Sequence, residues 1–134
     1  MLALADDSSE QIAAYIGLGR ILVAREGDAI LGHAQIVDTE LKSLAVAEDR
    51  RRSGVGRALV EAAIARARAD GAACLTVSTA TADIGNLRFY QRLGFRMTRI
   101  VRDAFGPRTG YPEGLTIDGI LLRDQVFLEF DLKA

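Results

Sequence analysis

The hydrophobic period of the chain changes near its middle, and this change limits the folds that it can adopt. The first half carries short strand-like apolar runs, at residues 21–25, 29–37 and 42–47. From 54 to 70 the apolar residues follow a helical period that ends at Gly71, and a further strand-like run covers 73–79. A strand, a helix and a strand of these lengths indicate a right-handed crossover between parallel neighbours. The sequence therefore predicts at least one parallel strand pair.

The other strand-like runs predict antiparallel neighbours. Glu26-Gly27-Asp28 is a hairpin-type turn between the first two runs, which indicates an antiparallel meander. Residues 86–93 form a short helical segment before Gly94, and strands are expected at 95–102 and 126–132. A capped helix is expected at 8–16. The predicted fold class is α/β, an α+β arrangement with a central mixed, mostly antiparallel sheet flanked by helices.

Length and composition favour one domain with a small or neutral partner. The chain has 134 residues, 49% hydrophobic and 26% charged, with a net charge of −1. These values indicate a single domain over 1–134 and exclude a disordered chain or a dedicated nucleic-acid or membrane-surface binder. Cys74 is the only cysteine, so no internal disulfide and no thiolate metal cage is expected, and a reducing, cytoplasmic setting fits best.

The residues between 44 and 57 have the order of an anion-binding turn. Leu44-Ala45-Val46 ends a strand, and Arg51-Arg52-Ser53-Gly54-Val55-Gly56-Arg57 opens the long helix. The two glycines have no Cβ to hold a ligand away, and the helix N-terminus directs backbone N–H groups at an anion. No Gly-Lys-Ser/Thr follows and the spacing is not G-x-G-x-x-G, which argues against a P-loop NTPase and a dinucleotide oxidoreductase.

Two motifs in this order resemble those of the GNAT family of N-acetyltransferases. Arg51-x-x-Gly54-x-Gly56 is similar to its pyrophosphate loop, written R/Q-x-x-G-x-G/A, and Asn86-x-x-x-Tyr90-x-x-x-Gly94-Phe95 is similar to its second conserved block. The resemblance covers about residues 21–132. It implies a GNAT-like fold in which one parallel strand pair splays around the coenzyme.

The resemblance also implies a reaction: acetyl transfer from acetyl-CoA to a primary amine by direct attack in a ternary complex, without a metal. The acceptor is a small molecule or a peptide amine. A backbone N–H near Val46 would stabilise the thioester oxygen. The expected coenzyme-binding residues are Leu44, Ala45, Val46, Arg51, Arg52, Ser53, Gly54, Val55, Gly56, Arg57, Asn86 and Tyr90.

Proton transfer is assigned to two side chains, each with a structural alternative. Tyr90 is expected to protonate the leaving thiolate, but its position also suits a packed aromatic. Asn86 is expected to cap the short helix as well as to contact the coenzyme. Glu40 is expected to deprotonate the acceptor through water, with Asp38 or solvent as alternative bases, and its structural alternative is an exposed turn residue at a strand entrance. His33 is read as a hydrogen-bonded structural residue.

Two segments depart from the family pattern. Only about twenty residues precede the first clear strand, so the N-terminus is expected to be shortened, without an opening strand. The connection 103–123 carries three glycines and two prolines before Leu115, and it resembles an extension seen in some bacterial members. Its apolar run 117–122 predicts a homodimer whose partner helps to wall the acceptor site. The alternative function is a non-catalytic acyl-CoA-binding regulatory or assembly module.

Overall fold

The computed structural model describes residues 3–6, 19–51 and 53–133, which fall into two compact units. The first unit spans 1–75 and 132–134, and the second spans 76–131. The strands are β1 (Ala3–Asp6), β2 (Arg20–Glu26), β3 (Ala29–Val37), β4 (Glu40–Val46), β5 (Cys74–Ala80), β6 (Arg96–Val101), β7 (Thr116–Ile117), β8 (Ile120–Leu121) and β9 (Gln125–Asp131). The helices are α2 (Val55–Ala69) and α3 (Ile84–Arg92), with 3-10 turns η1 (Glu48–Arg50) and η2 (Pro107–Thr109).

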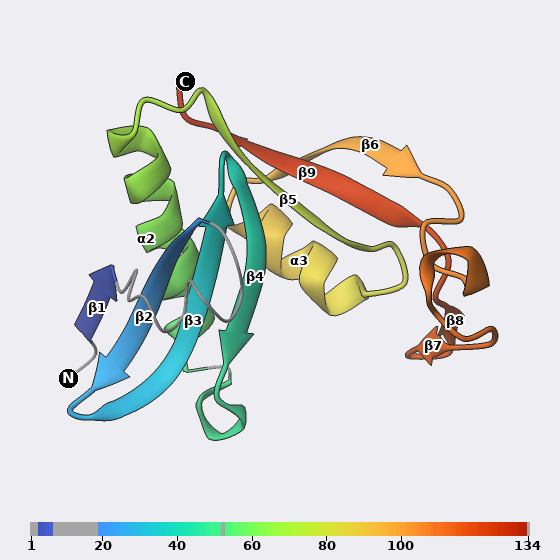
Figure 1. The fold of residues 1–134 in the computed structure, drawn as a ribbon, viewed down its shortest axis with the longest axis horizontal. Coiled ribbons are helices and arrows are strands. Elements are labelled where there is room, and N and C mark those ends of the chain that lie inside the picture. The colour runs from blue at the N-terminus through green and yellow to red at the C-terminus, as the bar shows by residue number, and fades with distance from the viewer. Residues whose placement is uncertain (1–2, 7–18, 52, 134) are drawn as a thin grey trace. The chain divides into compact units, whose positions relative to one another are not determined.

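The first unit contains an antiparallel meander in the order β1-β2-β3-β4 (Figure 1). This confirms the predicted meander. The expected loss of an opening strand is wrong, because β1 pairs with β2 from Ala3↔Arg25 to Asp6↔Leu22. The run Ala-Leu-Ala-Asp lacks β-branched and aromatic residues, so its strand conformation depends on pairing with β2 rather than on propensity. The helix expected at 8–16 lies outside the described residues.

Helix α2 packs against β2, β3 and β4 and forms the core of the first unit (Figure 1). Its buried residues are Val55, Leu59, Val60, Ala63, Ile64 and Ala67. Gly32 of β3 lies where these layers meet. A Cβ on Gly32 would be 2.5 Å from the Ala45 carbonyl oxygen and 3.1 Å from Leu59 Cδ1, so only glycine permits this approach.

The second unit holds most of β5, all of α3, and strands β9 and β6. The β6–β9 pair is antiparallel, from Arg96↔Glu129 to Val101↔Gln125. Beside β9, the Thr81 N–H donates to the Asp124 carbonyl at 2.9 Å, at the end of β5. Val126 and Leu128 are buried while Glu129 is exposed, which confirms the alternation predicted for the last strand.

The long connection 103–123 has its own secondary structure, which the sequence did not indicate. After η2, β7 and β8 form a hairpin with Thr116 opposite Leu121. Asp118 and Gly119 both have positive φ, 50° and 81°, as the tight turn between these strands requires. None of the described helices is long and apolar enough to span a membrane.

Candidate functional site

A β-bulge in β4 decides which way its side chains face. Ile36 is opposite Leu41 and Gln35 is opposite Ser43, so Lys42 is an extra residue without a partner. Cross-strand partners share a face of the sheet. Glu40 and Ser43, three residues apart, therefore lie on one face, whereas a regular strand would place them on opposite faces.

The three residues of β4 that were predicted to bind the pantetheine arm differ in the direction of their backbone groups. The Ala47 N–H donates to the Leu31 carbonyl at 2.7 Å, so the pair 31 and 47 is hydrogen-bonded. Bonded and non-bonded pairs alternate in an antiparallel ladder, which makes Ala45 and its partner His33 the next bonded pair. Leu44 and Val46 therefore direct their backbone N–H and C=O groups away from β3, and Ala45 directs its own toward β3.

The turn between β4 and α2 is shaped by its backbone. The Arg50 N–H donates to the Ala47 carbonyl at 2.8 Å, and the Ser53 hydroxyl donates to the Arg50 carbonyl. Gly54 is the N-cap of α2 with φ of 90°, a left-handed conformation that favours glycine.

Three backbone N–H groups are available at the start of α2. The bond from the Ala58 N–H to the Gly54 carbonyl, 3.0 Å long, opens the helical series. The N–H groups of Val55, Gly56 and Arg57 precede it and have no intrahelical acceptor. Together with the positive end of the helix dipole, these groups have the arrangement that attracts an anion at a helix N-terminus.

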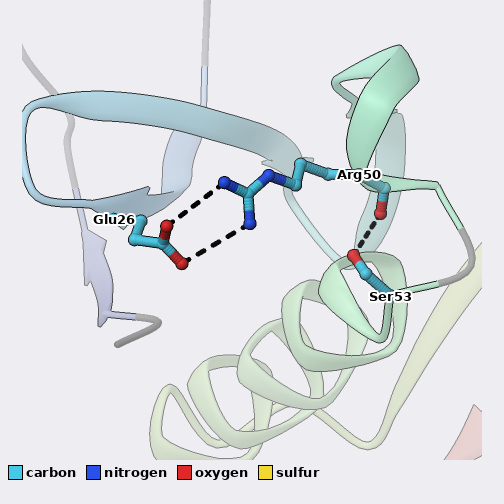
Figure 2. Close-up of polar contacts among 3 residues, drawn as sticks. All are labelled: Glu26, Arg50 and Ser53. Carbon is cyan, nitrogen blue, oxygen red and sulfur yellow. Dashed lines mark hydrogen bonds and ion pairs between the residues drawn. The ribbon is translucent and has the colours of Figure 1, made fainter.

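An ion pair connects this turn to the β2–β3 hairpin. Arg50 Nη2 lies 3.1 Å from Glu26 Oε1, and Arg50 Nη1 lies 3.5 Å from Glu26 Oε2. Figure 2 shows the guanidinium facing both carboxylate oxygens while the Ser53 hydroxyl bonds the Arg50 backbone. Sequence reasoning missed this contact because the two residues are 24 positions apart and no local pattern relates them.

The arginines predicted to bind phosphate differ in their surroundings. Arg51 is exposed, and Arg57 is exposed with its Nε 3.5 Å from Glu61 Oε1. Arg52 lies outside the described residues. An exposed pair such as Arg57 and Glu61 holds its partners weakly, so a phosphate can compete for the guanidinium.

Tyr90, in α3 of the second unit, is 7% exposed. Its ring makes edge contacts with Phe89 and Phe95, at centroid distances of 5.1 and 5.5 Å. Burial, followed by the negative charge of Asp83, raises the pKa of Tyr90 to about 12. The phenol therefore stays protonated at neutral pH and is available as a donor. The structure also shows the packed aromatic that the alternative interpretation described.

The N-terminus of α3 differs from the prediction. The helix begins at Ile84, and its N-cap is Asp83, whose Oδ1 accepts from the Asn86 N–H at 2.9 Å. Asn86 is thus not the cap, because Asp83 three residues earlier already accepts from its N–H. The exposed Asn86 side chain instead donates from Nδ2 to Thr79 Oγ1 at 3.2 Å, one turn before Tyr90.

The two candidate bases lie at the β3–β4 turn. Asp38 is exposed in the turn with φ of 56°. Glu40 is the first residue of β4, and its Oε1 lies 3.6 Å from Lys42 Nζ. On the same face, Ser43 Oγ lies 3.4 Å from His33 Nε2, in line with the structural interpretation of His33. Cys74 is half-buried, and no cluster of three or more His, Cys, Asp or Glu occurs in the described part of the chain.

Comparisons with known proteins agree on one family. Residues 17–97 match the family model described as "Acetyltransferase (GNAT) domain". The chain is 34% identical over 137 residues to the uncharacterised N-acetyltransferase YvbK of Bacillus subtilis, covering 98% of this chain and 87% of that protein.

Solved structures give the same result. A GNAT family acetyltransferase from Elizabethkingia anophelis with acetyl-CoA bound is 26% identical, with a TM-score of 0.80 and 97% of both chains covered. A Bacillus subtilis acetyltransferase in complex with CoA is 30% identical, with a TM-score of 0.79 and the same coverage. These likenesses confirm the predicted fold class.

Proposed function

The chain belongs to the GNAT family of N-acetyltransferases, and on that premise we propose that it transfers the acetyl group of acetyl-CoA to a primary amine by direct attack in a ternary complex. One observation in the first unit carries the proposal. A strand whose backbone groups at Leu44 and Val46 face away from β3 leads into a turn whose helix begins with N–H groups that lack an intrahelical acceptor. Two similar structures hold acetyl-CoA or CoA, which supports the same cosubstrate here.

The pyrophosphate is assigned to the turn. The N–H groups of Val55, Gly56 and Arg57 would donate to its oxygens, since they precede the first helical acceptor. Gly54 gives the turn its left-handed residue, and the Ser53 hydroxyl holds the turn through the Arg50 carbonyl. Arg51 and Arg52 would add positive charge.

The pantetheine arm and the thioester are assigned to β4. Leu44 and Val46 can pair with the arm because their backbone groups point away from β3, and one of these two N–H groups would stabilise the oxyanion. Ala45 has its backbone bonded to β3, so its contribution would be limited to a small side chain that leaves space for the arm. Of the three backbone positions expected from the sequence, we therefore propose that Leu44 and Val46 pair with the arm.

Glu40 is the proposed base. An alkylammonium has a pKa near 10.4, so the acceptor must lose a proton before it attacks. The bulge at Lys42 places Glu40 on the face of Ser43 and His33, and its half-buried carboxylate would receive that proton through water. The alternative Asp38 occupies the turn itself and is exposed to solvent, which makes it the weaker candidate.

Tyr90 is proposed to stabilise the leaving coenzyme A thiolate. A thiol has a pKa near 8.5, whereas that of Tyr90 is raised to about 12. Complete proton transfer from this phenol to a free thiolate would therefore be uphill by about 5 kcal/mol. A hydrogen bond from the phenol to the sulfur needs no such transfer, and solvent can supply the proton afterwards.

The alternative, a non-catalytic acyl-CoA-binding module, loses its main support. That alternative relied on a missing opening strand, and β1 is present beside β2. We further propose that 1–134 is one domain, because the matched segment 17–97 extends over both units. A cytoplasmic location is proposed from the single cysteine.

A homodimer through the connection 103–123 is also proposed. Four of its large apolar side chains are between 39% and 44% exposed, namely Tyr111, Leu115, Ile120 and Leu121. Such a cluster would bury apolar surface against a second copy. Sedimentation of a fully active monomer at high micromolar concentration would contradict the dimer.

Thiol release from acetyl-CoA tests the enzyme against a panel of polyamines, aminoglycosides, amino acids and peptide N-termini. We expect turnover with at least one primary amine. With that amine, Glu40→Gln should lower kcat at neutral pH while coenzyme affinity, measured by calorimetry, stays unchanged. Glu129→Gln on exposed β9 is the matched control. Coenzyme binding without turnover on any amine would support the non-catalytic module instead.

A further inference from the structure

A pocket of about 380 Å³ lies within the connection 103–123 of the second unit. None of its lining residues is assigned to the coenzyme or to proton transfer. The volume falls in the range of small-molecule sites, about 300–1,000 Å³. Apolar side chains contribute part of the wall, namely Phe105, Pro107, Pro112, Leu121 and Leu122.

Hydrogen bonds and a ring contact hold the segment around this pocket in place. The Phe105 N–H donates to the Arg123 carbonyl at 2.9 Å, and the Leu122 N–H donates to the Leu115 carbonyl at 2.8 Å. Thr109 Oγ1 donates to the Ala104 carbonyl at 2.7 Å. The Phe105 ring also meets Tyr111 edge-on at 5.2 Å. A segment tied at several points can present a preformed concave surface.

Four charged side chains line the pocket, two of each sign. Arg108 and Arg123 are positive, while Asp103 and Glu113 are negative. Within the described residues, no ion pair engages any of the four. Opposite charges that share a concave surface without pairing to each other are positioned to pair with a ligand that carries both signs.

We propose that this pocket binds a small zwitterion of the amino-acid type. Arg108 and Arg123 pair with its carboxylate, Asp103 and Glu113 pair with its ammonium, and its apolar side chain lies against Phe105 and the leucines. The residues of this pocket differ from those assigned to the coenzyme. A negative result at the pocket would therefore leave the proposed function unaffected.

Three related probes test the proposal on the full chain by NMR titration of the backbone amides of 103–123. L-phenylalanine carries both charges, L-phenylalanine amide lacks the carboxylate, and 3-phenylpropanoate lacks the ammonium. We expect saturable shifts with L-phenylalanine and at least fivefold weaker binding of the other two. Arg123→Gln should weaken L-phenylalanine about fivefold and leave the amide unchanged, because the amide has no carboxylate to lose.

Controls separate this result from a general charge effect. Arg92→Gln removes an exposed arginine of α3 outside the pocket, and it should leave all three affinities unchanged. Glu113→Gln should weaken L-phenylalanine and leave 3-phenylpropanoate unchanged. Equal affinities for the three probes, no saturable shift up to about 20 mM (about 20-fold above a Kd of 1 mM), or an equal loss in Arg92→Gln would overturn the proposal. Coenzyme A release measures separately whether the bound molecule is also acetylated.

Discussion

The turn before α2 and the region around Tyr90 in α3 would serve one reaction by different means. In the turn, the groups proposed to hold the coenzyme are backbone N–H groups of Val55, Gly56 and Arg57, and the glycines act by lacking a side chain. In α3, the proposed group is a single phenol whose environment raises its pKa. We therefore expect that an added side chain in the turn weakens coenzyme binding. At Tyr90, removal of the hydroxyl oxygen alone should lower the rate.

The largest effect is expected from an addition to the turn. In Gly56→Val the new side chain would obstruct the approach of the pyrophosphate to two or more N–H groups, each worth about 1.5–3 kcal/mol as a charge-assisted hydrogen bond. Calorimetry with acetyl-CoA should show a loss of at least 100-fold, or about 3 kcal/mol. Ala65→Val, on the exposed side of α2, introduces the same β-branched side chain and should bind acetyl-CoA with normal affinity. A folded Gly56→Val variant with normal affinity would refute the assignment of the turn.

The second effect is a loss of folding stability at alkaline pH that depends on the buried phenol of Tyr90. Burial raises the folded-state pKa of Tyr90 to about 12 from the usual 10.0 of a tyrosine, so the stabilisation of the folded state by the protonated phenol is complete below pH 10. As the pH rises through 10 to 12 this contribution is lost, by about 2.7 kcal/mol at most. Urea unfolding at pH 9 and pH 11.5 should show a smaller loss in Tyr90→Phe than in the parent. Tyr111→Phe, at an exposed tyrosine, should behave as the parent does.

Removal of the Tyr90 hydroxyl should also lower kcat, and we expect this effect to be smaller than the two preceding ones. Tyr90→Phe keeps the ring contacts with Phe89 and Phe95 and deletes only the hydroxyl, which is the proposed donor to the thiolate. We expect kcat to fall by about tenfold or more, with acetyl-CoA affinity preserved. Because the proposed role is hydrogen bonding, a coenzyme with a more acidic leaving thiol should recover part of the rate. A variant with full activity would show that Tyr90 only packs.

The smallest effect is expected at the ion pair that connects the turn to the β2–β3 hairpin. Arg50 and Glu26 are both more than a third exposed, so their pair contributes less than about 1 kcal/mol. Arg50→Gln should weaken acetyl-CoA about twofold to threefold, more at low salt than at high salt. Arg66→Gln breaks an equally exposed pair with Asp70 elsewhere on α2 and should leave the affinity unchanged. Equal losses in the two variants would remove any specific role for the Arg50 pair.

Local features were predictable from the sequence where neighbouring residues decide them. The glycine turn and helix α2 depend on Gly54, Gly56 and a helical period within about fifteen residues, and the structure has the helix at Val55–Ala69. The alternation of β9 was predictable for the same reason. The cap of α3 was not, because both Asp83 and Asn86 are suitable cap residues, and only the observed bond from the Asn86 N–H to Asp83 distinguishes them.

The sequence by itself determined the family resemblance, the order of the main strands and helices between residues 20 and 101, and the residue types proposed for coenzyme binding and proton transfer. Tertiary structure decided the orientation and the surroundings of these residues. The bulge at Lys42 moves Glu40 to the face of Ser43, and strand pairing turns the backbone of Leu44 and Val46 away from β3. Burial raises the pKa of Tyr90, and pairing with β2 makes a strand of Ala3–Asp6. These properties depend on residues distant in the chain, because register, burial and charge contacts exist only once the strands and helices have packed.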